Sequence, residues 1–259
     1  MARKAEALAL LAAIALLGAA ACAFSLCAGR ESTLGGYATS LRGRSPAQKH
    51  NAQLAARRLN GTAIPAGGTI SFNRIVGSWT ADRGYLRAPV SYDGELLPAW
   101  GGGVCQTSTT LYNAALLAGL EIKERHRHEY VPHYVAPGRD AAVAYPAIDL
   151  VLRNPYPWPV HLIVEAEHDV LQVSVIGPHR PADTVSIVEE AHSVIPAPAV
   201  VQVSASDSRR CGVANPGQAG REVVIYRVRR RDGRPSRYEL VSADYYPPIS
   251  RVVRVSQER

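Results

Sequence analysis

The sequence has few lysines, no low-complexity tract and no internal repeat. Of its 29 basic residues only Lys4, Lys49 and Lys123 are lysines, and the formal net charge is +7. An arginine-rich surface suits anionic partners such as phosphates and carboxylates. Because the basic residues are spread along the chain without an interleaved aromatic motif, we expect no nucleic-acid partner. With 259 residues, 47% of them hydrophobic, the chain is long enough for one sizeable domain and a small one.

Charged residues are absent from one N-terminal segment, residues 7–28, which follows Arg3 and Lys4. About 20 apolar residues can span a bilayer as a helix. The flanking positive charges predict that the N-terminus stays in the cytoplasm and that the rest of the chain lies outside. Residues 1–28 are therefore predicted to be an uncleaved membrane anchor or a signal segment, and the length favours the anchor. Lipoprotein cleavage at Cys22 is a weaker alternative.

Cysteine is scarce, with four in the chain. Cys22 and Cys27 lie in the apolar run, which leaves Cys105 and Cys211 in the part predicted to be exported. An oxidising compartment would permit a disulfide between these two; alternatively, Cys105 is a free, reactive thiol. The sequence has no Cys-x-x-Cys or His-Glu-x-x-His spacing. We therefore expect no metal ion and no cofactor.

The pattern of polar, apolar and turn-forming residues predicts an α+β protein. Residues 29–44 are polar and contain glycine, which indicates a linker. Residues 45–180 are predicted to form a mixed-sheet domain with a helix after a Gly-Gly-Gly-Val-Cys turn. Residues 181–259 are predicted to form a small all-β module.

Within the first domain, Ser45 as cap and Pro46 at the first helical position predict a helix that ends at Asn60. An Asp-Gly turn inside residues 90–97 predicts a β-hairpin. Apolar residues recur at helical spacing over residues 106–120. Further strands are predicted at residues 69–73, 121–132, 148–152, 160–164 and 170–176.

The glycine-rich turn that leads into the second predicted helix contains the candidate nucleophile. Gly101, Gly102 and Gly103 allow positive φ and the close approach of a ligand to the backbone. Cys105 follows where the helix begins, and a helix N-terminus favours the thiolate. Backbone N–H groups near Gly103 and Gln106 could hold an oxyanion during acyl transfer.

A cysteine nucleophile needs a base, and two histidines follow the helix. His126 and His128 lie two residues apart on the predicted strand and would share one face. The pattern does not separate them, although we favour His128. Asp140 or Asp149 could orient the histidine.

Several short motifs lie between residues 45 and 177. They are Ser71-Phe72-Asn73, Gly84-Tyr85, Gly101-Gly102-Gly103-Val104-Cys105-Gln106, Ser108-Thr109-Thr110-Leu111-Tyr112-Asn113, Glu124-Arg125-His126 with His128, and Tyr134 with Pro137-Gly138-Arg139-Asp140. Together, these motifs resemble the VanW family over residues 45–177. The C-terminal part resembles, loosely, the small β modules of the G-five (G5) type.

The resemblance implies export and a role in the cell envelope. Some family members are understood to act as L,D-transpeptidases, which make 3→3 peptide cross-links in peptidoglycan through a cysteine. Carried onto this sequence, Cys105 would be the nucleophile. Together with the residues reasoned above, the predicted catalytic set is Cys105, His128, His126 and Asp140. Residues of the matching motifs would bind substrate or the oxyanion. These are Gly101, Gly102, Gly103, Gln106, Thr109 and Tyr134.

Two functions follow as hypotheses. The first is a cysteine-dependent, L,D-transpeptidase-like acyl transferase that acts on peptidoglycan stem peptides. The second is a non-catalytic wall-binding or scaffold protein of the glycopeptide-resistance accessory type, in which Cys105 is structural, with a disulfide to Cys211 as one option. Both place the chain at the membrane through its N-terminal helix, with anionic wall polymers as a further candidate partner.

Overall fold

The structure is a computed structural model that describes residues 31–92, 95–204 and 212–256. The predicted anchor or signal segment at residues 1–28 lies outside these ranges, and so does Cys211. Within the described ranges, no helix is both long and apolar enough to cross a bilayer.

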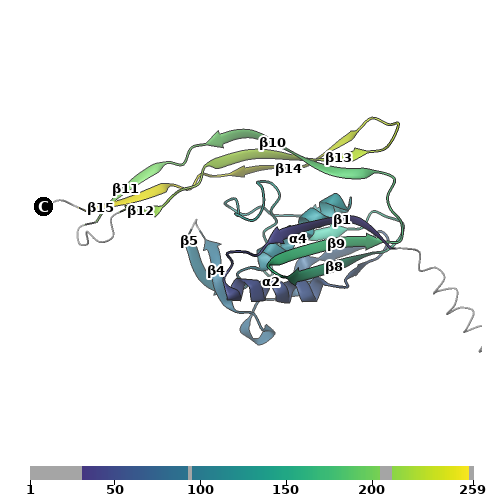
Figure 1. The fold of residues 1–259 in the computed structure, drawn as a ribbon, viewed down its shortest axis with the longest axis horizontal. Helices are drawn as coiled ribbons and strands as arrows, with labels where there is room; N and C mark the ends of the chain where they lie inside the picture. Colours follow the sequence, from purple (N-terminus) through teal and green to yellow (C-terminus); the bar gives the residue numbers. More distant parts are fainter. Residues whose placement is uncertain (1–30, 93–94, 205–211, 257–259) are drawn as a thin grey trace, which may run out of the picture.

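Two helices cover one face of a four-stranded sheet in the first domain (Figure 1). The strand order is β1-β9-β8-β2. Along β8, Val160, Leu162 and Val164 are buried and the residues between them are exposed, as expected for a sheet with one solvated face. The elements are β1 (Ser32–Ser40), α2 (Pro46–Leu59), β2 (Ala63–Ile64), α4 (Val104–Leu117), β8 (Val160–Glu167) and β9 (Val170–Gly177).

The first helix, α2, begins and ends where the sequence predicts. The Ser45 side chain accepts a hydrogen bond from the Gln48 N–H, and the Gln48 side chain accepts one from the Ser45 N–H. This capping box, with Pro46 in the first turn, satisfies backbone donors that a helix start leaves open. The helix ends at the cap residue Asn60.

The predicted linker at residues 29–44 is wrong, because β1 occupies most of it and pairs with β9 as the edge of the main sheet. Gly35, one of the glycines in the predicted linker, serves close packing. A Cβ at Gly35 would lie 2.2 Å from the Ala118 backbone nitrogen, so only glycine lets the end of α4 approach the strand. The buried Thr39 hydroxyl lies 2.9 Å from that of Thr110 in α4.

Smaller elements complete the first domain. The hairpin predicted near residues 90–97 is present as β4 and β5, although its Asp93-Gly94 turn lies outside the described residues. The strand predicted from residue 69 ends at Ser71, which caps a short helix. These elements are β3 (Thr69–Ser71), α3 (Phe72–Val76), the 3-10 turn η1 (Ala81–Arg83), β4 (Arg87–Tyr92), β5 (Glu95–Trp100), β6 (Glu121–Glu124) and β7 (Val151–Arg153).

The chain is α+β, as expected, with strands dominating, but the mixed sheet predicted for the first domain is wrong. Every strand pair described there is antiparallel. β8 and β9 form a hairpin, and β1 and β2 pair antiparallel with its two outer edges, so no parallel pairing arises.

The strand predicted over residues 121–132 is also too long. β6 ends at Glu124, because its partner β7 has three residues and Val151 is the last residue available to pair. From Arg125 to Leu150, the chain forms loops with two isolated bridges, between His126 and Ala142 and between Ala144 and Ile148. These loops carry the candidate site.

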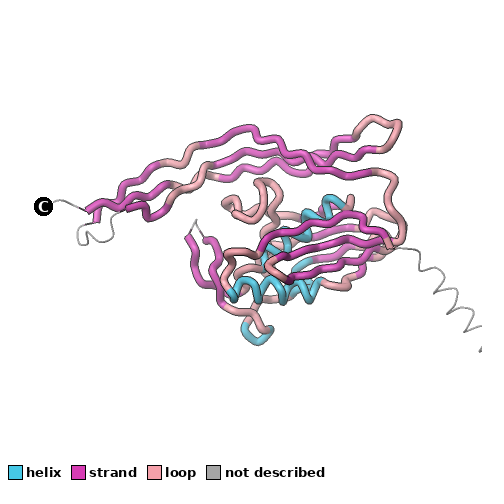
Figure 2. The backbone as a smooth tube through the Cα atoms, viewed as in Figure 1, coloured by secondary structure: helices cyan, strands magenta, loops and turns pink. Residues whose placement is uncertain are grey.

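The C-terminal module forms two three-stranded sheets in orders β10-β13-β14 and β11-β15-β12. Figure 2 shows only strands and loops in its described part. β11 and β15 form a parallel pair. The module extends past the first domain in Figure 1, with β13 and β14 lying over the first domain's loops. Its strands are β10 (Thr184–Ile195), β11 (Ala199–Ser204), β12 (Gly212–Asn215), β13 (Gly220–Arg230), β14 (Arg237–Tyr246) and β15 (Arg251–Ser256).

Candidate active site

Cys105 is the second residue of α4 and carries a free, partly buried thiol. At the helix start, the Val104 N–H donates to Gly101 O at 3.0 Å and the Gln106 N–H donates to Gly103 O at 3.2 Å. Within the described part of the chain, no acceptor is found for the Cys105 N–H. The amide of the candidate nucleophile itself is therefore an open donor at this helix start.

The glycine triplet packs against protein rather than an open cleft. A Cβ at Gly101 would lie 2.8 Å from the Trp79 ring, and one at Gly103 would lie 2.3 Å from Gln48 O. Gly102 is buried in the same way. These contacts account for the glycines through close packing of α2 and its neighbours. The binding of a ligand at this turn stays a prediction.

His128 and Asp140 lie together beside Cys105. The His128 ring Nδ1 is 2.7 Å from Asp140 Oδ2, and its backbone N–H donates to the same oxygen at 2.6 Å. The His128 ring also lies near the Cys105 side chain, close enough for its charge to act on the thiol. Because Nδ1 faces the carboxylate, Nε2 is the nitrogen available to the sulfur. This is the order of groups in a nucleophile, base and orienting-acid triad.

The local charges favour a thiolate paired with an imidazolium. Burial opposes the charged form of His128, but the hydrogen bond to Asp140 and the interaction with Cys105 outweigh it and raise the pKa of His128 to about 9. Burial likewise opposes the Cys105 thiolate, yet the nearby positive charge of His128 lowers the pKa of Cys105 below its ordinary value. In its protonated form the Cys105 thiol donates a hydrogen bond to Val143 O, 3.3 Å from the Sγ.

The Asp140 carboxylate is fully buried and ionised. Burial opposes its charge, but the hydrogen bond from His128 and the positive charge of Arg125 lower the pKa of Asp140. Its second oxygen, Oδ1, accepts hydrogen bonds from Arg125 Nη2 at 3.0 Å and from the Tyr246 hydroxyl at 2.5 Å. Neither partner was among the predicted site residues. Arg125 lies in a family motif and could have been found, whereas Tyr246 is 106 residues away from Asp140 and carried no signal.

The polar side of α4 holds the segment that carries Asp140. Ser108 Oγ donates to Ala141 O at 2.7 Å, and Thr109 Oγ1 accepts from Ala141 N at 3.0 Å. One turn later, Asn113 Nδ2 donates to Arg139 O at 2.6 Å. Thr109 was predicted to bind substrate, but in the structure its side chain is fully buried and positions this loop.

Gln106 also has a structural role. Its side chain is buried, donates to Thr39 Oγ1 at 3.0 Å and Ser40 O at 2.8 Å, and accepts from Arg44 Nε at 3.1 Å. With its backbone N–H bonded to Gly103 O as well, Gln106 has no donor left for the predicted oxyanion site.

Tyr134 lies close to the sulfur. Burial, together with the nearby Cys105 charge, raises the pKa of Tyr134. The phenol therefore stays protonated and can donate. The Arg44 guanidinium lies 4.9 Å from the centre of the Tyr134 ring.

Two predicted residues lie elsewhere. The exposed His126 ring faces Glu124, with Nε2 2.9 Å from Oε1, so the two histidines do not share one face. Asp149 accepts hydrogen bonds from Ser71 Oγ and the Asn73 N–H, and so holds the start of α3. In the described residues, no cluster of three metal-ligating side chains is found.

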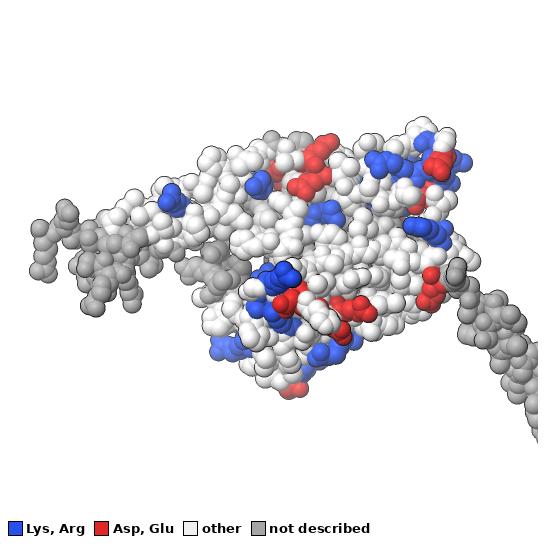
Figure 3. Space-filling view, in the orientation of Figure 1, with Lys and Arg blue, Asp and Glu red and all other residues white. Residues whose placement is uncertain are grey.

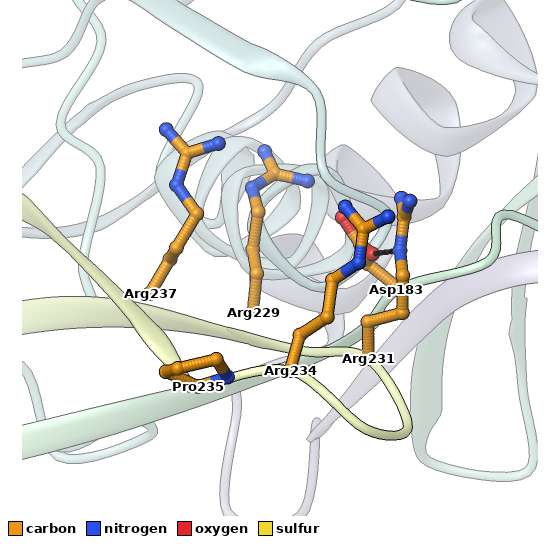
Figure 4. A pocket seen from close by; sticks show the side chains of 6 residues that line it. All are labelled: Asp183, Arg229, Arg231, Arg234, Pro235 and Arg237. Carbon is orange, nitrogen blue, oxygen red and sulfur yellow. Dashed lines mark hydrogen bonds and ion pairs between the residues drawn. The ribbon is translucent and has the colours of Figure 1, made fainter.

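A second polar feature lies at the turn that joins β13 to β14. Figure 3 shows basic side chains gathered over this end of the module, with acidic ones among them. A hollow of about 210 Å³ opens there, and Figure 4 shows arginine side chains from both strands around it. Asp183 forms an ion pair with Arg231, with 2.5 Å between Oδ1 and Nε. The lining residues are Asp183, Arg229, Arg231, Arg234, Pro235 and Arg237.

Residues 47–176 match the VanW family, described as VanW like protein, and residues 188–257 match the G5 domain. Over 127 residues the chain is 39% identical to the uncharacterized protein YoaR of Bacillus subtilis (strain 168), covering 49% of this chain and 42% of YoaR. Over 110 residues it is 36% identical to the vancomycin B-type resistance protein VanW of Enterococcus faecalis (strain ATCC 700802 / V583), covering 40% of each. The chain thus spans less than half the length of either relative.

A solved structure, the IgA1 protease G5 domain, is 22% identical and covers 32% of this chain and all of that one, with a TM-score of 0.21. A score this low carries no argument about arrangement. The VanW match covers half of the chain, and the G5 match covers most of the remainder. The chain therefore belongs to the VanW family and carries a C-terminal G5 module.

Proposed function

We propose that this protein is a cell-wall acyl transferase that cross-links peptidoglycan stem peptides through Cys105, in the manner of an L,D-transpeptidase. The observation that carries the proposal is the Cys105, His128 and Asp140 arrangement. It joins a free thiol with a lowered pKa to a histidine that a buried carboxylate orients. A purely structural cysteine needs none of these partners.

The chemistry runs in two half-reactions. The Cys105 thiolate attacks the carbonyl between an L-configured residue and D-alanine, which forms a carbon–sulfur bond. The carbon–nitrogen bond then breaks, and D-alanine leaves as an amine that takes its proton from His128. An amine of a neighbouring stem next attacks the thioester and gives a proton to His128. The new amide forms, the carbon–sulfur bond breaks and the thiolate returns.

Two donors are candidates for holding the oxyanion in each half-reaction. The Cys105 N–H is open at the helix start, where the helix dipole adds positive potential. The Tyr134 hydroxyl is protonated and near the sulfur. Both replace the predicted donor near Gln106.

The envelope location rests on the family and on the N-terminus. One relative is named as a vancomycin resistance protein, which supports a role in wall chemistry. We propose that residues 7–28 anchor the chain in the membrane, or direct its export, with the two domains outside. The arginine-lined hollow on the G5 module supports binding of anionic wall polymers. In the described part of the chain, Arg234 and Arg237 there have no carboxylate within ion-pair distance.

The test is muropeptide analysis with matched variants of the full chain. Walls of a strain that depends on this gene product for 3→3 cross-links are digested and compared after complementation. Cys105→Ala and His128→Ala should abolish the 3→3 dimers. His126→Ala should retain them, because it removes an exposed ring two residues from the base. Unchanged 3→3 dimers with Cys105→Ala would reject the enzyme and leave the non-catalytic wall-binding protein.

A further inference from the structure

We propose that the G5 module completes the active site, with Tyr246 and Asp244 of β14 as positioning residues that hold Asp140 and, through it, His128. The inference rests on the proposed function of Cys105. It goes beyond that function because it makes the second module part of the catalytic machinery rather than a separate wall-binding unit.

The first support is the hydrogen-bonding of the Asp140 carboxylate. Oδ2 receives both bonds from His128, while Oδ1 receives one from Arg125 and one from Tyr246. Tyr246 is buried and its hydroxyl donates at 2.5 Å. A carboxylate held at both oxygens cannot rotate, so the bond from β14 fixes the oxygen that orients His128.

The second support is the placement of the charges. Arg125 is 7% exposed and lies between two carboxylates. Its Nη2 donates to Asp140, and its Nη1 lies 2.7 Å from each oxygen of Asp244. Asp244 therefore balances the positive charge of the buried Arg125 guanidinium, which Asp140 would otherwise balance alone. This leaves the Asp140 charge for the His128 imidazolium.

The third support is the packing of the loop that carries Asp140. Tyr246 also accepts a hydrogen bond from the Gly138 N–H at 2.9 Å, two residues before Asp140. A Cβ at Gly138 would lie 2.6 Å from Ile225 Cγ1, so β13 packs directly on this loop. Val223, Ile225 and Tyr246 form a small buried cluster with Val131 against it. The loop is thus held between α4 on one side and the G5 module on the other.

This arrangement predicts that the VanW domain without its G5 module keeps the thiol but loses the placement of its base. Tyr246 does not touch substrate or the sulfur in this account, so its effect must pass through Asp140 and His128. A readout on the thiol itself therefore separates positioning from stability.

The experiment compares Tyr246→Phe with Tyr245→Phe in the full chain. The two changes remove the same atom from adjacent residues of β14, but Tyr245 is 45% exposed and makes no contact with Asp140. Alkylation of the Cys105 peptide by iodoacetamide is followed by mass spectrometry over a range of pH, and thermal unfolding is recorded for each variant. Asp244→Asn serves as a second variant on the Arg125 side.

With Tyr246→Phe we expect the apparent pKa of the thiol to rise and alkylation near neutral pH to slow about tenfold, the scale of losing one charge-assisted hydrogen bond. Tyr245→Phe should match the wild-type profile. A Tyr246→Phe protein with a lower melting temperature but an unchanged alkylation profile would overturn the inference, because Tyr246 would then be only structural. The assay needs no peptidoglycan, so failure of the cross-linking test does not alter this readout.

Discussion

His128 and Asp140 are joined through a single oxygen. Asp140 Oδ2 lies 2.7 Å from the His128 ring Nδ1 and 2.6 Å from the His128 backbone nitrogen. Sharing one acceptor between the backbone and the ring of the same residue fixes both the loop and the rotation of the imidazole. The histidine is therefore oriented before substrate arrives.

The orienting carboxylate should be essential for catalysis. Asp140→Asn keeps the shape but favours the wrong tautomer of His128, and we expect cross-linking to fall by about 10²-fold or more, as in other triads. Rates of dimer formation from purified disaccharide-tetrapeptide measure this. The matched control is Asp149→Asn, which alters the carboxylate that holds α3 and should leave the rate per folded molecule near wild type. Equal losses in both variants would contradict the assignment of Asp140.

The Cys105 and His128 pair predicts an unusual dependence of stability on pH. With its pKa raised to about 9, native His128 stays protonated above pH 6.5, where the unfolded imidazole loses its proton. The lowered pKa of Cys105 acts in the opposite direction, because the native thiol gives up its proton at a lower pH than the unfolded thiol does. The proton gained on His128 and the proton lost from Cys105 therefore offset each other, and stability depends less on pH than it would with His128 alone.

Cys105→Ala should expose the dependence of folding stability on pH that His128 alone produces. With the thiol gone, His128 still gains a proton on folding through Asp140, so stability declines as pH rises through its folded pKa, by at most about 1.4 kcal/mol per pH unit. Denaturant unfolding of wild type and variant across this range measures the difference. Parallel stability curves for the two proteins would show that the native pair is neutral.

Gly103 should tolerate no side chain. A Cβ at Gly103 would meet Gln48 O at 2.3 Å, and its φ of 108° strains any other residue, so Gly103→Ala should destabilise the fold by about 3 kcal/mol or more. Gly61→Ala is the control, since Gly61 has a φ of 77° with nothing within 4 Å. It should cost only about 1 kcal/mol. Urea unfolding compares them, and equal costs would mean that packing at Gly103 is loose.

The arginine-lined hollow should make binding to anionic polymers dependent on salt. The double variant Arg234→Gln with Arg237→Gln removes two charges that lack carboxylate partners in the described residues, so affinity for purified teichoic acid should fall about tenfold or more at low ionic strength. A double change in the first domain, Arg42→Gln with Arg87→Gln, controls for net charge. Equal losses in the two double variants would indicate non-specific attraction.

Much of the local structure could be predicted from the sequence, because the signals are local. The cap at Ser45 fixes α2, and the glycine turn before Cys105 fixes the start of α4. β1 was missed because Gly35 satisfies a long-range contact with Ala118, and a sequence shows the glycine without its neighbour.

The candidate site was predictable only in part for the same reason. Cys105 and Asp140 came from motifs, and His128 was favoured over its neighbour without a physical reason for the choice. The structure gives that reason, because only His128 meets Asp140. Tyr246 and Asp244 reach the site from another module, across more than 100 residues, and no local pattern marks such a contact.

The central claim is tested most directly by looking for the covalent intermediate on Cys105. The full-length protein is mixed with disaccharide-tetrapeptide, quenched in acid and digested, and the Cys105 peptide is weighed by mass spectrometry. The account predicts a thioester adduct equal to the stem without its terminal D-alanine, together with free D-alanine, and neither with Cys105→Ala. An unmodified Cys105 peptide and no released D-alanine from folded wild-type protein would contradict it.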